Sequence, residues 1–258
     1  MTSDATDLEG ALAAVELDAD AAIRALTAAM KAAKRVKSAA ALGQIRELEQ
    51  SLANASGLAQ EAAGAVAVTE QAWQFDVRGW FDSGEYTREL LAAAAAAGVQ
   101  AYQSDDRILC YPAIVQVLAD ATISVDKQRD RRVRPSVAVR HLAALQQRPP
   151  KFKPEAFIES LAAAYDYVVG AKHLRPGATA KLVDVHRVLT LLPGTARDYT
   201  RQEFARDMYL LDQSGVVEVK DGRRMSLPAS ALTRGTGVLT TVTRGGQSKI
   251  YAGISFQE

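Results

Sequence analysis

The sequence contains little of what defines several common classes of protein. Only one of its 258 residues is cysteine, which excludes an intrachain disulfide and a zinc site built from cysteines. Aromatic residues make up 6%, and much of the 48% that is hydrophobic is alanine, which favours helices. No apolar run approaches the roughly 20 residues that span a bilayer, and the N-terminal residues are acidic where a targeting signal is basic. We therefore expect a cytoplasmic protein that does not enter a membrane.

The sequence also lacks the motifs of most enzymes. It contains no phosphate-binding Gly-x-x-x-x-Gly-Lys-Ser/Thr loop, no Gly-x-Ser-x-Gly elbow and no His-Glu-x-x-His. We expect no metal and no cofactor. One fragment, Glu218-Val219-Lys220, resembles the Glu-x-Lys of metal-dependent nucleases, and Asp207 or Asp212 could supply a further carboxylate. Simple strand alternation, with Val219 inside and its neighbours outside, explains the fragment equally well.

Positive charge is local, because the net charge is only +1. Between Lys127 and Lys153 nine basic residues accompany one acidic residue, Asp130. The densest part, 127–134, is expected to be an exposed loop before a helix that begins at Pro135. Its arginines are candidates for binding phosphates: Arg129, Arg131, Arg132 and Arg134. The alternative is that the loop contacts an acidic subunit or only solvent.

Heptad spacing dominates residues 1–76. Two series of mainly apolar residues advance by alternating steps of four and three, which is typical of a coiled-coil seam. They are Leu8, Leu12, Val15, Ala19, Ala22, Leu26, Ala29, Ala33, Val36 and Ala40, and then Ile45, Leu48, Leu52, Ala55, Ala59, Ala62, Val66, Thr69 and Trp73. The step of five between the series predicts a turn near 38–43 and an antiparallel helical hairpin. One continuous helix paired with a second chain is the alternative. Basic residues at 31–37 could touch nucleic acid or an acidic partner, or could lie on a solvated face.

Residues 77–178 are expected to form a mixed middle region. Stretches 107–111, 113–118 and 122–125 are rich in β-branched residues and predict a small antiparallel sheet of two or three strands. A proline-rich linker at 149–154 precedes a helix over 155–169.

Residues 179–258 predict helix, turn, capped helix and basic hairpins. Thr200 and Glu203 can form a capping box, and Gly215 suits the left-handed residue that ends a helix. Asp221-Gly222 marks a hairpin turn, and a second hairpin is expected from 238–243 to 248–256. On the capped helix, Gln202, Arg206, Tyr209 and Gln213 share the face opposite Phe204, Met208 and Leu211.

This order resembles the winged-helix superfamily over about 181–256. The resemblance implies that the capped helix faces the DNA major groove, with Gln202, Arg206 and Tyr209 toward base edges. It also implies phosphate contacts from the hairpins, through Arg223, Arg224, Arg244 and Lys249. Glu203, Asp207 and Asp212 make the helix slightly acidic, and other winged helices bind proteins.

We therefore predict a mainly helical α+β protein with a coiled-coil arm, a middle region with a small sheet and a winged-helix-like module. The leading hypothesis for function is non-enzymatic binding of nucleic acid, duplex DNA in particular, with the arm docking a protein partner or a second copy. The alternatives are a structural adaptor subunit of a larger complex and a metal-dependent nuclease.

Overall fold

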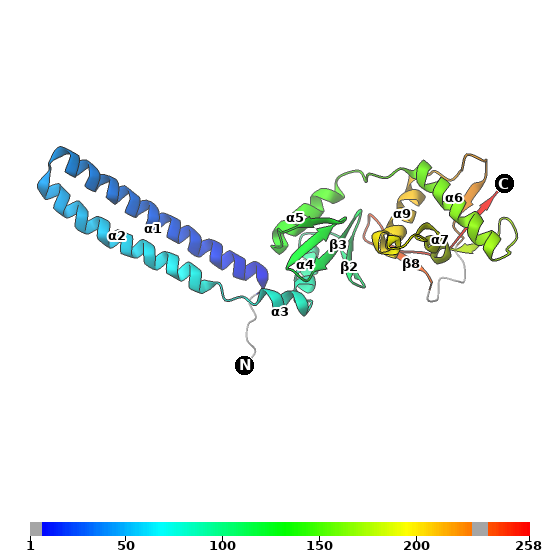
Figure 1. The fold of residues 1–258 in the computed structure, drawn as a ribbon, viewed down its shortest axis with the longest axis horizontal. Coiled ribbons are helices and arrows are strands. Elements are labelled where there is room, and N and C mark those ends of the chain that lie inside the picture. Colours follow the sequence, from blue (N-terminus) through cyan, green and yellow to red (C-terminus); the bar gives the residue numbers. More distant parts are fainter. Residues whose placement is uncertain (1–6, 229–236) are drawn as a thin grey trace. The chain divides into compact units, whose positions relative to one another are not determined.

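A computed structural model describes residues 7–228 and 237–258. The chain divides into two compact units (Figure 1). One contains the described residues up to 90 with 119–121 and 133–137, and the other contains the remainder. The predicted mixture of long N-terminal helices and antiparallel strands is confirmed. No helix in the described ranges combines the length and the apolar character that crossing a bilayer requires.

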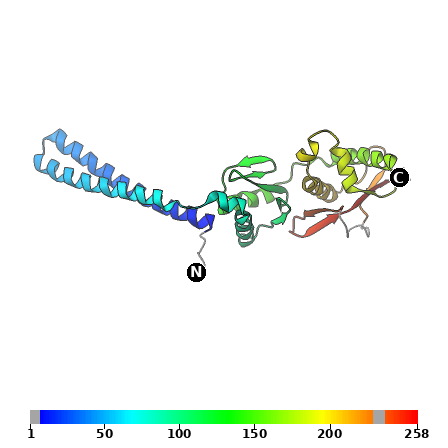
Figure 2. The same ribbon diagram turned by 60° about the horizontal axis from the view of Figure 1, so that its bottom comes forward.

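The first unit is dominated by an antiparallel pair of long helices, α1 (Leu8–Leu42) and α2 (Ile45–Ala72), which we call the arm (Figures 1 and 2). Asp7 caps α1 by accepting a hydrogen bond from the Gly10 N–H at 2.7 Å. Gly43 ends α1 at φ 66°, a left-handed conformation that glycine adopts without steric cost. The chain therefore turns back within one polypeptide, as the step of five predicts.

The seam between these helices differs from the predicted one. Its buried residues are small, and they include Ala22, Ala32 and Ala39 of α1 with Ser51 and Ala62 of α2. Leu26, Leu52 and Val66, which the prediction places in the seam, are 50%, 51% and 45% exposed. Alanine seams allow the two backbones to approach closely, so the larger side chains are left outside.

Two short helices complete the first unit, α3 (Val77–Asp82) and the beginning of α4 (Glu85–Ala96). Glu89 holds the start of α1, since its carboxylate accepts hydrogen bonds from the Leu8 and Glu9 N–H groups at 3.1 and 2.8 Å. The Trp80 indole donates to the same carboxylate at 2.8 Å. These contacts attach the arm to its base.

The second unit begins with a five-stranded antiparallel sheet, where two or three strands were predicted. Its strands are β1 (Tyr102–Ser104), β2 (Arg107–Cys110), β3 (Ala113–Leu118), β4 (Thr122–Val125) and β5 (Gln128–Asp130), paired in sequence order. The prediction of an exposed loop over 127–134 is therefore wrong for 128–130, which form an edge strand. These residues are polar and carry no β-strand signature, so their pairing depends on the neighbouring strand β4. Helix α5 (Pro135–Gln146) begins at Pro135 as predicted.

The C-terminal part contains α6 (Pro154–Ala171), β6 (Ala180–Lys181), α7 (Leu182–Leu189), α8 (Thr195–Asp198) and α9 (Arg201–Ser214). The strands β7 (Arg224–Ser226), β8 (Leu239–Val242), β9 (Ser248–Tyr251) and β10 (Gly253–Gln257) follow. Strand β10 lies between β6 and β7, and β8 pairs with β9 separately (Figure 2). The second predicted hairpin is therefore interrupted at Ala252, after which the chain joins a different sheet.

One apolar core unites this part. Phe204, Met208 and Leu211 of α9 are fully buried, together with Leu161 of α6 and Ile254 of β10. The capping box is present, since the Thr200 hydroxyl accepts from the Glu203 N–H and the Glu203 carboxylate accepts from the Thr200 N–H. Gly215 adopts the predicted left-handed conformation, with φ 74°. The local signals in this stretch thus hold in the folded chain.

Candidate functional site

The side of α9 that the winged-helix resemblance assigns to DNA bases is covered by the protein's own chain. Tyr209 is only 5% exposed, and its ring meets that of Tyr111 edge-on with centroids 5.4 Å apart. Its hydroxyl oxygen accepts a hydrogen bond from the Arg244 N–H at 3.1 Å. The placement of Tyr209 on an open polar face is therefore corrected: this tyrosine belongs to the core because its apolar ring has Tyr111 to pack against.

Arg206 lies between two carboxylates. Its guanidinium contacts Asp126 at 2.9 Å and Asp207 at 3.0 Å, and its side chain is 22% exposed. Burial lowers the pKa of Arg206, but Asp207 and Asp126 outweigh that effect and leave the pKa above its ordinary value. Arg206 is thus a charged residue whose donors are used within the fold rather than a free reader of bases.

Asp207 joins Arg206 to a buried tyrosine. Its side chain is 14% exposed, and it accepts a hydrogen bond from the Tyr199 hydroxyl at 2.9 Å. Burial raises the pKa of Asp207, although Arg206 and Tyr199 act in the opposite direction. Burial and the nearby Asp207 also raise the pKa of Tyr199. A buried carboxylate that loses one of its partners destabilises the fold, so Arg206, Asp207 and Tyr199 stabilise one another.

The first turn of α9 contacts loops of the five-stranded sheet. Gln202 donates to the Asp105 carboxylate at 3.2 Å. Lys127 forms an ion pair with Glu203 at 2.9 Å, and it also donates to the Asp198 carbonyl. Burial raises the pKa of Glu203, but hydrogen bonds from Thr200 and Lys127 outweigh it, so the pKa lies below its ordinary value. Lys127 and Gln202 therefore serve contacts within the second unit.

The predicted phosphate-binding arginines of the basic run do not act as one group. Arg132 pairs with Asp130 at 2.7 Å and lowers the pKa of that carboxyl to about 2. Arg129 donates to the Thr122 hydroxyl at 3.2 Å. Arg131 is exposed, and no ion pair of Arg131 is found within the described residues. Arg134 belongs to the other unit.

In that first unit, Arg134 is engaged by the start of α1. Its guanidinium contacts Glu9 at 2.7 Å and Glu16 at 2.5 Å. Glu9 also accepts from the Ser136 N–H and hydroxyl, both at 2.9 Å. Burial raises the pKa of Glu9, but Ser136 and Arg134 outweigh it and the pKa lies below its ordinary value. A phosphate that bound to Arg134, as predicted from the sequence, would thus compete with two carboxylates.

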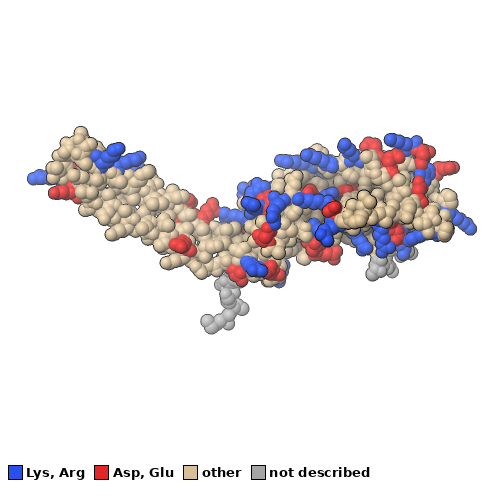
Figure 3. Space-filling view, in the orientation of Figure 1, with Lys and Arg blue, Asp and Glu red and all other residues tan. Residues whose placement is uncertain are grey.

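The predicted phosphate contacts near the C-terminus differ in whether they have an acidic partner. Arg223 pairs with Asp166 at 2.7 Å and Asp221 at 2.8 Å, and these two carboxylates raise its pKa. Lys249 lies 3.6 Å from Asp212. Arg224 and Arg244 have no ion pair among the residues that the structure describes. On the face shown in Figure 3, cationic and anionic side chains alternate over the C-terminal elements and form no continuous positive track.

One cleft of the second unit does gather positive charge. Its volume is about 680 Å³, and we call it the basic cleft. Arg129, Arg132, Arg148 and Lys151 line it together with Arg206. Three carboxylates, those of Asp126, Asp130 and Asp207, line the same cleft, so the cations are partly neutralised. Of the eleven predicted nucleic-acid contacts, Arg129, Arg132 and Arg206 are the ones that this cleft brings together.

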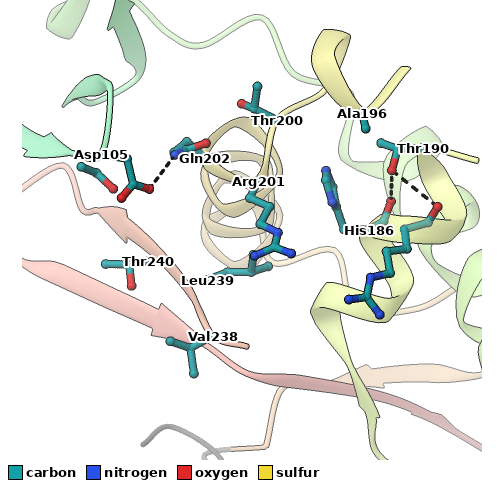
Figure 4. A pocket seen from close by; sticks show the side chains of 12 residues that line it. Asp105, His186, Thr190, Ala196, Thr200, Arg201, Gln202, Val238, Leu239 and Thr240 are labelled. Carbon is teal, nitrogen blue, oxygen red and sulfur yellow. Dashed lines mark hydrogen bonds between the residues drawn. The ribbon is translucent and has the colours of Figure 1, made fainter. Parts of the chain in front are cut away.

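A second cavity of about 410 Å³ lies beside the start of α9. Figure 4 shows that it is lined by His186 of α7, Thr190 after that helix, Arg201 and Gln202 of α9 and Val238 to Thr240. The His186 Nε2 lies 2.8 Å from the Tyr199 carbonyl oxygen. Burial lowers the pKa of His186, so the ring is held in its neutral form. Among the described residues that line the cavity, Asp105 is the one with a carboxylate, and it already accepts from Gln202.

The nuclease-like fragment has no catalytic arrangement around it. Glu218 and Lys220 are exposed and Val219 is buried, as strand alternation predicts. The proposed extra carboxylates are engaged elsewhere: Asp207 as described above, and Asp212 by the Tyr251 hydroxyl at 2.8 Å. Within the described chain there is no group of three or more histidine, cysteine or carboxylate side chains that could hold a metal ion.

Comparison with known proteins assigns no family to the chain. No protein-family model matches it, and neither the curated proteins nor the solved structures contain a match. Arg148 and Lys151 line the basic cleft but were not among the predicted contacts, because those were taken from the densest part of the basic run, 127–134. A cluster of cations on both sides of a short helix was the available signal.

Proposed function

We propose that the protein is a non-enzymatic adaptor that holds another polypeptide through the outer surface of its arm. The observation that carries this proposal is an inverted distribution of side-chain size. Apart from Leu8, the fully buried residues of α1 and α2 are alanine and serine, while Ile23, Leu26 and Met30 are 59%, 50% and 52% exposed. Isolated exposed apolar residues are ordinary, but a series on one helix surface is typical of an interaction site.

The exposed apolar residues of the arm are spread along both helices. On α2, Ile45, Leu52 and Val66 are 62%, 51% and 45% exposed. They recur every seven residues or a multiple of seven, which keeps them on one side of a helix. An antiparallel pair of alanine-lined helices buries little area by itself, so an additional packing partner would stabilise the arm considerably.

The C-terminal part is proposed to be a winged-helix-like module. Its elements follow the order α6, β6, α7, α9, β7 and β10, and β10 lies between β6 and β7. The succession of helix α7, the capped helix α9 and the strands that follow supports this proposal, and α8, β8 and β9 belong to the same stretch. Because Gln202, Arg206 and Tyr209 are engaged within the chain, we propose that the module serves as a structural platform rather than a base reader.

The adaptor proposal is tested by placing a charge on the outer surface of the arm. We expect Leu26→Glu to abolish whatever stoichiometric complex the full-length protein forms, whether with itself or with a co-purifying protein. Gln60→Glu adds the same charge at an exposed position of α2 with no large apolar side chain and serves as the control. Light scattering coupled to gel filtration measures the complex. An unchanged complex in Leu26→Glu, with both variants folded, would refute the proposal.

A second candidate function, binding of duplex DNA, is favoured by the basic cleft. Arg148 and Lys151 line this cleft and are exposed, and Arg129 and Arg132 lie with them. Phosphate contacts make binding salt-dependent. We expect Arg148→Ala with Lys151→Ala to weaken binding in fluorescence anisotropy at 50 mM salt, and Arg175→Ala, an exposed cation that does not line this cleft, to leave it unchanged. Absence of binding at low salt would end this candidate.

A further inference from the structure

We propose that the outer surface of α1 pairs antiparallel with the same surface of a second copy of this chain. This inference rests on the adaptor function of the arm and names its partner. The surface is a stripe on the side of α1 away from the seam. Ile23, Thr27 and Met30 form its centre, acidic residues precede them and basic residues follow.

The stripe has the spacing of a coiled-coil seam. Its residues fall at 16, 20, 23, 27, 30, 34 and 37, so the steps alternate between four and three. This is the heptad pattern that keeps side chains on one side of a helix against a partner helix. Every one of these positions is exposed, although the two apolar ones are large. The outer side of α1 thus carries a second heptad series, in addition to the alanine-rich one that packs against α2.

The order of charges along the stripe determines the orientation. Asp20 and Lys34 each lie seven residues from Thr27, which is about 10 Å along the helix in opposite directions. Glu16 and Lys37 lie roughly 15 Å from the same residue. A second α1 can be placed by a twofold axis that passes near Thr27 and is perpendicular to the helix. The two helices then run antiparallel, and the basic end of the second lies beside the acidic end of the first. Ile23 of one copy then meets Met30 of the other.

A parallel pair would bring like charges together. Asp20 would face Asp20 and Lys34 would face Lys34, which is destabilising, whereas the antiparallel pair satisfies both. A surface that is complementary to itself after a twofold rotation is what a symmetric dimer requires. An unrelated partner needs no such symmetry, so the charge order favours a second copy.

Three of the four charges of the stripe are unpaired within the described chain. Asp20, Lys34 and Lys37 have no ion pair among the described residues, while Glu16 accepts from Arg134 and remains 64% exposed. On the face shown in Figure 3, positive side chains gather toward the turn of the arm, and the adjoining stretch is largely uncharged. Asp20 and Lys34 are therefore the pair that tests the orientation most cleanly.

The test exchanges charges in the full-length protein. In an antiparallel dimer, Asp20→Lys places two lysines opposite each other at both ends, and Lys34→Asp does the same with carboxylates. We expect each variant to dimerise roughly tenfold more weakly at low salt. Mixing the two variants pairs lysines with aspartates at both ends, so the mixture is expected to recover the wild-type affinity within about threefold. Sedimentation velocity at several concentrations measures the dimer, and circular dichroism verifies that each variant keeps its helices.

The outcomes distinguish this inference from the adaptor function. A dimer whose affinity neither variant changes, or a mixture that stays as weak as its components, would overturn antiparallel pairing. A monomeric wild type that co-purifies with a different protein, in a complex lost in Leu26→Glu, would overturn self-pairing and leave the adaptor function intact. A monomer with no Leu26-dependent partner would refute both.

Discussion

Replacing Arg206 by alanine separates a structural role of this residue from a role in reading DNA. Arg206 is held between Asp126 and Asp207, and Asp207 in turn accepts from the buried Tyr199 hydroxyl. Removing the guanidinium leaves Asp207, whose side chain is 14% exposed, with one neutral donor and no cation. We expect the variant to be strongly destabilised rather than selectively unable to bind a ligand.

The structure gives the size of the effect. Breaking a buried ion pair by removing one partner costs about 3–5 kcal/mol, because the other charge stays buried and uncompensated. Asp207 keeps its bond from Tyr199, and the Asp126 side chain is 45% exposed and can be hydrated. We therefore expect a loss of about 3 kcal/mol in the free energy of unfolding. Lys249→Ala is the matched control, since its pair with Asp212 is 3.6 Å long and its side chain is 47% exposed. That variant should lose less than about 1 kcal/mol.

Urea unfolding followed by circular dichroism measures both variants. The pH dependence adds a second criterion. Burial raises the pKa of Asp207, so the folded state binds this proton more tightly than the unfolded state does, and the stability it contributes is lost as pH rises. Without Arg206 the pKa of Asp207 is raised further. The loss in the free energy of unfolding caused by Arg206→Ala should therefore become smaller as pH falls. A variant that unfolds like wild type but loses affinity for duplex DNA would refute the structural role.

The other predictions concern pH and backbone conformation. His186 is 5% exposed and burial lowers its pKa, so its contribution to stability is present above the unfolded pKa of about 6.5 and is lost as pH falls. The urea midpoint of His186→Gln should therefore fall less between pH 7.5 and pH 5 than that of wild type, and His173→Gln should behave like wild type. Gly57 lies inside α2 with open space where a Cβ would be, so Gly57→Ala should stabilise the protein by about 0.5–1 kcal/mol in the same assay. Gly215 has φ 74°, and Gly215→Ala should destabilise it by about 1 kcal/mol. Equal effects of the two glycine changes would contradict the conformational argument.

Local signals were predictable because each depends on few neighbouring residues. The capping box of Thr200 and Glu203, the left-handed Gly215 and the start of α5 at Pro135 all require contacts within a single turn. The hairpin of the arm was predictable from one irregular step in a long heptad series. In each case the local spacing of residues in the sequence determines the local structure.

The seam of the arm was harder to predict because two heptad series run through the same helices. Ala22 belongs to both the predicted and the observed seam. Leu26 and Ala33 were predicted to lie in the seam, but Ala25 and Ala32 lie there instead. Choosing the larger residues as buried is the usual rule. It fails here because close approach of the two helices selects alanine.

The candidate site depended on long-range pairing, which spacing alone does not encode. Asp126 and Arg206 are 80 residues apart, and Arg223 and Asp166 are 57 apart. Lys127 and Arg134 of the basic run were read as free charges because their partners, Glu203 and Glu9, lie far away in the sequence. Residues 128–130 were read as a loop since only their neighbour β4 makes them a strand.

The distribution of paired charge gives an additional reason to look for the partner at the arm. In the second unit, several cations that seemed free in the sequence have carboxylates from the same chain, as Arg132, Arg206 and Arg223 do, whereas Arg131, Arg224 and Arg244 have none among the described residues. Along the outside of α1, the opposite holds within the described residues: Asp20 and Lys34 lie fourteen residues apart on one rigid helix, so they cannot reach each other. Water hydrates these exposed charges in a single chain, and a second chain could pair with them. A second α1 in the opposite direction supplies both partners at once, which is why the charge exchange at these two residues is the more informative measurement.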